Sequence, residues 1–159
     1  VKNRIIADNQ QIVRVDHEQI ISLTESLEQF IIDQLPDLLR DVKVVAISDY
    51  GKGFLTSTLL EAVIHQAKKQ GIPVITDPKG HDFKKYKGTT IIKPNLSEAF
   101  AAAKLPSSAP LEQVASAVLQ QTDAQLLMVT RSEAGISLFD YLGTRSDFPV
   151  HAKEVKDVT

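Results

Sequence analysis

The chain has 159 residues, of which 43% are hydrophobic and 24% charged, a size and composition suited to one globular domain and short for two. Its 18 lysines and arginines against 20 aspartates and glutamates give a net charge of -2, which excludes the broad positive field of a nucleic-acid-binding protein. Cysteine is absent, which excludes disulfides and thiolate metal sites and suits a cytoplasmic protein, and no apolar run reaches the ~20 residues of a membrane span.

The first part of the chain predicts a β-hairpin followed by a helix. Apolar Ile6 and residues 12–15 flank a polar stretch at 8–10, a pattern typical of two short antiparallel strands. Residues 18–34 then carry apolar side chains at helical spacing, and Pro36 is expected to end that helix. The side chains expected on its inward face are Ile20, Leu23, Leu27, Phe30 and Ile31.

From residue 42 onwards, strands alternate with helices. Residues 42–47 form a nearly continuous apolar run, which is typical of a strand covered on both faces in a parallel sheet. Thr56 or Ser57 is expected to cap a helix that runs to Gln70, with Gly71 closing it. The inward residues of that helix are expected to be Leu59, Leu60, Val63, Ile64 and Ala67.

The alternation continues through the second half of the chain. Further strands are expected at residues 73–76, 89–92, 125–130 and 136–139, with a short helix ending at Lys104 and another at 111–121. The strands and turns after residue 136 look antiparallel. Strands alternating with helices predict a three-layer α/β/α fold with a mostly parallel sheet and right-handed crossovers.

Four loops rich in functional groups follow the predicted parallel strands. They are SDYGKG at 48–53, DPKG at 77–80, KPNLSE at 93–98 and TRSEAG at 130–135. Ligands of open α/β sheets bind outside the carboxyl ends of the strands, so these loops should share one edge. Each loop alone is a weak signal, because Gly, Pro and Asp also simply make turns.

The charges in these loops favour an anionic ligand. Lys52, Lys79, Lys93 and Arg131 are expected to face one another beside helix N-termini, which suits a phosphate. Three carboxylates, those of Asp49, Asp77 and Glu98, are candidates to organise a divalent cation through water. Lys84, Lys85 and Lys87 are expected to lie in a solvated loop.

Several other kinds of site are excluded by the residues. There is no G-x-x-x-x-G-K-[ST] phosphate loop and no G-x-G-x-x-G after the first parallel strand. The four histidines are too scattered for a metal site, and no G-x-S-x-G elbow of a hydrolase is present.

Taken in order, these loops resemble the ribokinase-like family of carbohydrate kinases, and within it the heptose 7-phosphate kinase domains of ADP-heptose synthases. PNLSE at 94–98 is similar to the family's N-x-x-E motif for magnesium and phosphate, and TRSEAG at 130–135 to the turn that meets the ATP phosphates. Residues 1–16 resemble the hairpin of the family's substrate lid, and residues 17–159 its nucleotide-binding α/β core. The likeness therefore runs nearly end to end.

The resemblance implies phosphoryl transfer from ATP to D-glycero-D-manno-heptose 7-phosphate, giving the 1,7-bisphosphate used for the inner core of lipopolysaccharide. It implies ATP and Mg²⁺ as cofactors, with Asn95 and Glu98 holding the metal through water. The residues implied for nucleotide and phosphate binding are Asn95, Glu98, Thr130, Arg131, Gly135 and Lys79. Those implied for the sugar side are Asp49, Lys52, Arg4, Gln11 and Arg14.

The sequence departs from the family pattern at its ends. The family follows Asp-Val-Thr with Gly-Ala-Gly-Asp, which supplies the anion hole and the catalytic base, whereas this sequence stops at Thr159. Met128 is the one methionine, so the chain does not start with an initiator residue. We therefore expect a central piece of a longer kinase that is inactive by itself, the alternative being a naturally short chain that has lost its first methionine.

Three hypotheses about function stay open at this point. The first is a sugar-phosphate kinase, the second a non-catalytic α/β module that binds a nucleotide or sugar phosphate, and the third an interaction domain without a small ligand. The intact protein is expected to be a cytoplasmic homodimer held through the lid hairpin, without nucleic-acid or membrane partners.

Overall fold

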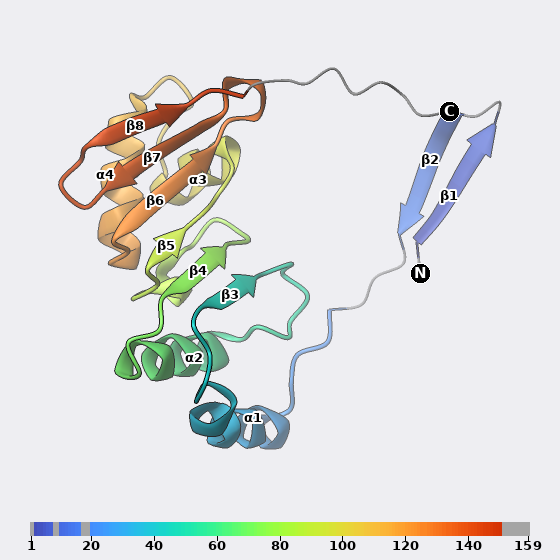
Figure 1. Ribbon diagram of the computed structural model, residues 1–159. Coiled ribbons are helices and arrows are strands. Elements are labelled where there is room, and N and C mark those ends of the chain that lie inside the picture. The colour runs from blue at the N-terminus through green and yellow to red at the C-terminus, as the bar shows by residue number, and fades with distance from the viewer. Residues whose placement is uncertain (1, 8–9, 17–19, 151–159) are drawn as a thin grey trace.

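The computed structural model describes residues 2–7, 10–16 and 20–150. A two-stranded antiparallel hairpin, β1 (Lys2–Ala7) and β2 (Gln10–Asp16), precedes everything else, as the sequence predicts. It stands apart from the rest of the molecule in Figure 1. The predicted loop at residues 8–9, the predicted helix start at Glu18 and the chain end at 156–159 lie outside the described residues.

The main sheet has six strands in the order β3-β4-β5-β6-β7-β8. Its strands are β3 (Val45–Ser48), β4 (Val74–Asp77), β5 (Ile91–Ile92), β6 (Leu126–Thr130), β7 (Ile136–Asp140) and β8 (Arg145–Phe148). The first four are parallel, and β7 and β8 add to β6 as antiparallel strands. A mostly parallel sheet with flanking helices and a small N-terminal hairpin confirms the predicted fold class.

The strand register places one continuous buried row across the sheet. The paired residues of this row are Ile47, Thr76, Ile92, Leu127 and Phe139, and each is buried. Its four apolar members share one hydrophobic core with residues of α2 (Ser57–Lys69), α3 (Leu96–Ala103) and α4 (Leu111–Thr122). The inward residues predicted for the second helix are confirmed, with Leu59, Leu60, Ile64 and Ala67 buried.

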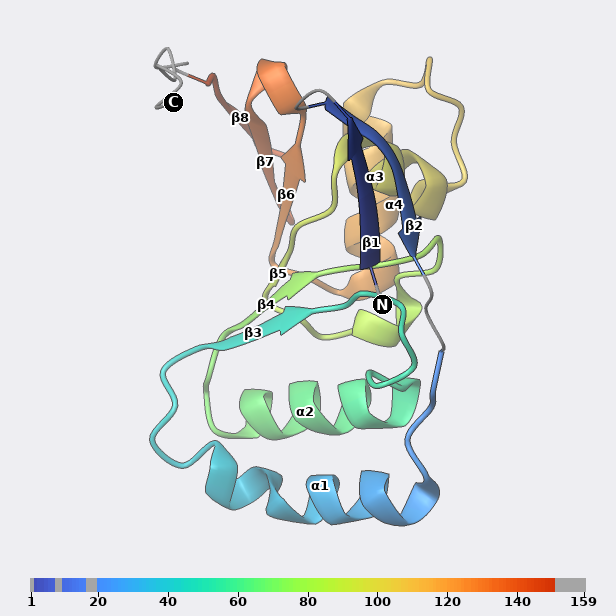
Figure 2. The ribbon, with the colours of Figure 1, turned by 90° about the vertical axis from the view of Figure 1, so that its right-hand side faces the viewer.

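The neighbouring row of residues lies on the opposite face and is far less covered. Ala46 and Ile75 are exposed and Ile91 is half-buried, although they pair in the same register. In Figure 2 the helices lie to one side of the sheet. The prediction that the first parallel strand is covered on both faces is therefore wrong for the described residues, because alternate side chains of β3 face opposite sides and helices pack on one of them.

Helix α1 (Glu25–Leu38) differs from its prediction at both ends. Its N-cap is Thr24, whose hydroxyl accepts a hydrogen bond from the Leu27 amide, so the helix starts later than the apolar pattern suggested. Pro36 does not end the helix, because it falls in the last turn and the helical bonding resumes at the Leu39 amide, 3.0 Å from Leu35 O.

The face that α1 presents to the molecule is also not the predicted one. Leu27 and Phe30 are exposed, whereas Leu35 is buried and Ile31 and Ile32 are half-buried. Helix α1 makes its main contacts with α2, so a narrow stripe is enough to seat it. None of the helices in the described part of the chain combines the length and apolar character that crossing a membrane requires.

Candidate functional site

A polar cleft of about 340 Å³ opens where the parallel strands β3, β4, β5 and β6 end. Its lining residues are Ser48, Asp49, Tyr50, Asp77, Pro78, Lys79, Lys93, Asn95, Glu98 and Thr130. They come from all four of the loops that the sequence places at this edge. The parallel strands bring them together, because all of their carboxyl ends meet on the same side of the sheet.

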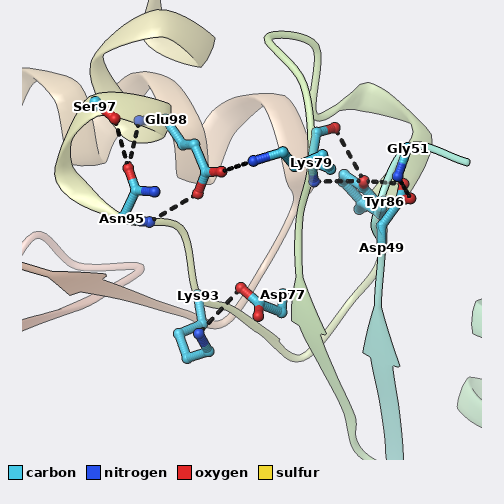
Figure 3. Close-up of polar contacts among 9 residues, drawn as sticks. All are labelled: Asp49, Gly51, Asp77, Lys79, Tyr86, Lys93, Asn95, Ser97 and Glu98. Carbon is cyan, nitrogen blue, oxygen red and sulfur yellow. Dashed lines mark hydrogen bonds and ion pairs between the residues drawn. The ribbon is translucent and has the colours of Figure 1, made fainter. Parts of the chain in front are cut away.

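The N-x-x-E sequence at 95–98 forms a complete capping box at the start of α3. Asn95 Oδ1 accepts a bond of 2.9 Å from the Glu98 amide, and Glu98 Oε2 accepts one of 3.1 Å from the Asn95 amide (Figure 3). The Ser97 hydroxyl donates to Asn95 Oδ1 as well, at 2.8 Å. The two motif residues thus fix the helix N-terminus, and its partial positive charge, at the floor of the cleft.

Two lysines of the cleft are paired with carboxylates. Lys79 Nζ lies 2.9 Å from Glu98 Oε1, and Lys93 Nζ lies 3.0 Å from Asp77 Oδ1. The hydrogen bond that Lys79 donates to Glu98 raises the pKa of Lys79, so this side chain is a cation at neutral pH. The two ammonium groups and the α3 N-terminus give the cleft three positive features that can meet a phosphate.

Asp49 is the most enclosed charged residue of the cleft. Oδ1 accepts from the Gly51 amide at 2.7 Å, and Oδ2 accepts from Lys85 Nζ and from the Tyr86 hydroxyl, each at 2.6 Å. Burial by itself raises the pKa of Asp49, but the bonds from Lys85, Tyr86 and Gly51 outweigh it and hold the pKa below its ordinary value.

Sequence reasoning missed two of these partners. Lys85 is not in a solvated loop, because its ammonium pairs with the buried Asp49 carboxylate, and Tyr86 is completely buried. Both lie in the short 3₁₀ turn Lys84–Tyr86, between β4 and β5. The one signal in the sequence was an aromatic residue among lysines, which does not by itself indicate a carboxylate partner.

The three carboxylates do not converge as metal ligands. Asp49, Asp77 and Glu98 each hold a different lysine, and no group of three or more acidic, histidine or cysteine side chains that could bind a metal occurs in residues 2–7, 10–16 and 20–150. The idea that these three carboxylates jointly organise a cation is therefore wrong. Glu98 still suits a magnesium ion approached through water, because Mg²⁺ usually keeps several waters and adds one or two carboxylates and substrate phosphates.

The turn that follows β6 places Thr130 in the cleft, whereas its arginine contacts the turn itself. Thr130 lines the cleft and pairs with Asn95 across an isolated bridge, which joins the two motifs side by side. Arg131 points its guanidinium at Ala134 O, 3.1 Å from Nη2, and toward Asp147, 3.7 Å away. Its buried Nε has no hydrogen-bond partner among the described residues. Gly135 has φ +84°, and a Cβ there would come 2.0 Å from Phe148 O, so backbone packing already requires glycine.

Four residues predicted for the sugar side lie elsewhere. Lys52 lines a neighbouring, mostly apolar groove of about 560 Å³ between β3, α1 and α2. Arg4, Gln11 and Arg14 lie on the hairpin, where Arg4 and Arg14 are cross-strand partners. Figure 1 shows the hairpin separated from the sheet, on the side toward which the arrowheads of β3 and β4 point. Lys52 and Arg4 thus do not line the cleft, and the side chains of Gln11 and Arg14 lie outside the described part of the chain.

Comparison with known proteins identifies relatives for almost the whole chain. A family model described as pfkB family carbohydrate kinase matches residues 5–159. The "Bifunctional protein HldE" of Citrifermentans bemidjiense is 44% identical over 160 residues, which cover 99% of this chain and 33% of that protein. The chain spans about a third of the length of the curated relatives that it matches.

Solved structures show the same fold at low sequence identity. Phosphofructokinase-2 from Escherichia coli, in complex with potassium, superposes with a TM-score of 0.73 at 20% identity, over 96% of this chain and 50% of that one. Ribokinase from Arabidopsis thaliana, complexed with ribose and ATP, gives a TM-score of 0.61 at 21% identity over 77% and 39% of the two chains. The chain thus shares its fold with these two solved structures.

Proposed function

Because the chain belongs to the pfkB family of carbohydrate kinases, we propose that its cleft binds the phosphates during ATP-dependent phosphorylation of a sugar phosphate. The observation that carries the proposal is the convergence of Lys79, Lys93 and the α3 N-terminus at one edge of the sheet. Phosphoryl transfer requires positioning and charge neutralisation more than covalent chemistry, and these groups supply both. ATP as the donor is supported by the ribokinase relative that binds it.

We further propose D-glycero-D-manno-heptose 7-phosphate as the acceptor, with the 1,7-bisphosphate as product and lipopolysaccharide core assembly as the pathway. The support is the resemblance of the four loops to heptose 7-phosphate kinases, together with 44% identity to a bifunctional HldE protein over the length of the chain. Lys52 and the hairpin residues Arg4, Gln11 and Arg14 are the proposed sugar-side contacts, reached when the hairpin covers the cleft.

Each cleft residue has a definite proposed role. Lys79 and Lys93 neutralise the phosphate oxygens, while Thr130 and the α3 N-terminus donate hydrogen bonds to them. Arg131 and Gly135 shape the turn that carries Thr130. Asn95 and Glu98 hold Mg²⁺ through water. Mg²⁺ held there would reduce the negative charge of the nucleotide phosphates.

Each carboxylate that lines the cleft is paired with a lysine, Asp49 with Lys85, Asp77 with Lys93 and Glu98 with Lys79. A general base must lie within hydrogen-bond reach of the proton that it accepts, and these pairings dedicate none of the three carboxylates to that role. We therefore propose that these 159 residues alone bind nucleotide without turnover, and that the base is supplied by another part of the polypeptide.

The hairpin is the proposed contact between two copies of the protein. Its apolar side chains Ile5, Ile6, Ile12, Val13 and Val15 are all exposed, from 40% to 67%. A two-stranded hairpin is at best marginally stable alone in water, and this one has both apolar surface and free strand edges. A second hairpin of the same kind would satisfy both needs, which supports a homodimer.

The proposal is tested by a kinase assay on the polypeptide encoded by the whole gene, with ATP and a panel of sugar phosphates. We expect heptose 7-phosphate to be the best acceptor and Lys79→Met to lower kcat/KM about 100-fold, the scale for removing one preorganised charge-stabilising group. Lys68→Met, an exposed lysine near the end of α2, is the matched control and should leave kcat/KM unchanged. Saturable nucleotide binding without turnover of any sugar would instead favour a non-catalytic binding module.

A further inference from the structure

Tyr86 connects the hydrophobic core to the polar cleft. The residue is 0% exposed, and its ring packs edge-on against Phe83 with the ring centroids 6.0 Å apart. The ring is part of the main core cluster, whereas the hydroxyl reaches the loops that line the cleft, as Figure 3 shows. A buried tyrosine hydroxyl needs polar partners, and the identity of these partners suggests what it does.

The Tyr86 hydroxyl bridges the loops that follow β3 and β4. It donates to Asp49 Oδ2 at 2.6 Å and accepts from the Lys79 amide at 3.0 Å. Lys79 O lies 3.3 Å away and is a weaker alternative acceptor. A phenol has a single proton, so donation to Asp49 and acceptance from Lys79 together use the group fully.

The Asp49 carboxylate is held by three internal donors. Besides Tyr86, it accepts from the Gly51 amide and from Lys85, whose ammonium also lies 4.9 Å from the centre of the Tyr86 ring. Its side chain is 4% exposed. A carboxylate so enclosed has little capacity left for a sugar hydroxyl, although the sequence suggested that role.

The same contacts determine where the Lys79 ammonium lies. With its amide held by Tyr86, the Lys79 side chain extends across the cleft to Glu98, which in turn caps α3. Gly51, whose amide is held by Asp49, lies beside the Lys79 side chain, since a Cβ at Gly51 would come 3.5 Å from Lys79 Cγ.

We propose that Tyr86 is a positioning residue which, through Asp49 and the Lys79 backbone, holds the Lys79 ammonium in place for the phosphate. This inference rests on the proposed function of the cleft. It assigns Asp49 to the internal support of two loops and away from substrate contact. Lys85 contributes by completing the charge balance of the buried carboxylate.

The test is the change Tyr86→Phe in the full gene product, which removes the hydroxyl and keeps the ring. We expect the dissociation constant for the magnesium complex of a non-hydrolysable ATP analogue to rise about tenfold and kcat/KM to fall by a similar factor. Hydrogen exchange of the peptide containing the Lys79 amide should accelerate, while that of α4 should not change. Tyr141→Phe removes a hydroxyl from an exposed tyrosine far along the chain and should alter none of these values.

A double-mutant cycle shows whether Tyr86 acts through Asp49. Asp49→Asn should weaken nucleotide binding in the same direction, and the tenfold effect of Tyr86→Phe should shrink in that background, because the two side chains form one unit. Lys85→Met should have a similar effect to Asp49→Asn, and Lys85→Arg should restore near-normal binding.

Three results would overturn the inference. The first is an unchanged nucleotide affinity of the Tyr86→Phe variant. The second is a lower melting temperature with faster hydrogen exchange throughout the core but a normal kcat/KM, because a purely structural residue would give that result. The third is full additivity in the cycle. A wild-type protein that phosphorylates no sugar would refute the proposed function instead, and the positioning role is then judged on nucleotide affinity and hydrogen exchange alone.

Discussion

Individual charged residues in the cleft have roles that depend on their neighbours in space. Lys79 and Lys85 both lie between β4 and β5. Lys79 nevertheless spans the cleft to Glu98, whereas Lys85 pairs with the buried carboxylate of Asp49. Asp49 directly follows β3 and Asp77 ends β4, but of the two only Asp49 is enclosed by three donors. Function at this scale is therefore set by which partner each side chain meets.

The Asp49 cluster predicts a pH dependence of stability. Its donors hold the pKa of Asp49 below the ordinary value, so the folded state binds this proton less readily than the unfolded state. The stabilisation is fully present above the unfolded pKa of about 3.9 and is lost as the pH falls through the lower, folded pKa.

We therefore expect Asp49→Asn to be clearly less stable than wild type at pH 7, and the difference to shrink below about pH 4. Urea unfolding at a series of pH values measures this. Asp41→Asn, in an exposed loop, is the control and should differ little from wild type at any pH. A difference between Asp49→Asn and wild type that stays constant down to pH 3 would contradict the prediction.

At the scale of elements, short local motifs fix where the cleft residues sit. The capping box places the start of α3, and the bridge between Asn95 and Thr130 joins that start to the end of β6. The turn after β6 then brings β7 back antiparallel, and Gly135 is where this turn meets Phe148. Each motif serves the fold and the site together, so a motif of this kind does not by itself reveal ligand binding.

Gly135 gives a prediction at this scale. A methyl group there would overlap Phe148 O, and φ +84° is unfavourable for any residue with a Cβ. Gly135→Ala should therefore cost about 3 kcal/mol of unfolding free energy. Gly143→Ala has a similar φ of +85° but open space around it, and should cost about 1 kcal/mol.

Chemical denaturation of the two variants measures the difference. Equal losses would show that backbone conformation alone matters and that the contact with Phe148 yields. A normal stability in Gly135→Ala combined with weakened nucleotide binding would point to a direct ligand role for this glycine.

For the whole molecule, the arrangement of uncovered apolar surface matters most. The hairpin stands apart in Figure 1 with its apolar side chains exposed, and one face of the sheet carries exposed Ala46 and Ile75. Water-exposed apolar area of this kind usually marks an interaction site. Of these two surfaces, the hairpin is the one that we propose to contact a second copy of the protein.

Charged residues on the hairpin should abolish the proposed dimer. Ile5 and Val13 are direct cross-strand partners, so Ile5→Lys together with Val13→Lys places two like charges on one face. We expect this variant of the full gene product to sediment as a monomer at concentrations where the wild type is a dimer. Leu142→Lys, at an even more exposed apolar residue in the β7–β8 turn, is the control and should remain dimeric. A monomeric wild-type protein would contradict the proposal.

Much of the fold follows from local sequence patterns. The hairpin, the inward face of α2, the order and direction of the parallel strands and the final antiparallel pair agree with their predictions, because alternation and helical spacing encode burial directly. The coverage of β3 and the buried face of α1 are the exceptions. The contacts of α1 are mainly with α2, which lies about thirty residues further along the chain.

The candidate site, like the fold, could be predicted from the sequence only in part. The sequence by itself determined that four polar loops share the carboxyl edge of a parallel sheet, since strand direction alone places them there. Only the tertiary structure decided which lysine meets which carboxylate, that Tyr86 joins the loops after β3 and β4, and that Lys52 and the hairpin lie outside the cleft. The physical reason is that hydrogen bonds and ion pairs act over a few ångströms in space, between residues such as Asp49 and Tyr86 that are far apart in the chain.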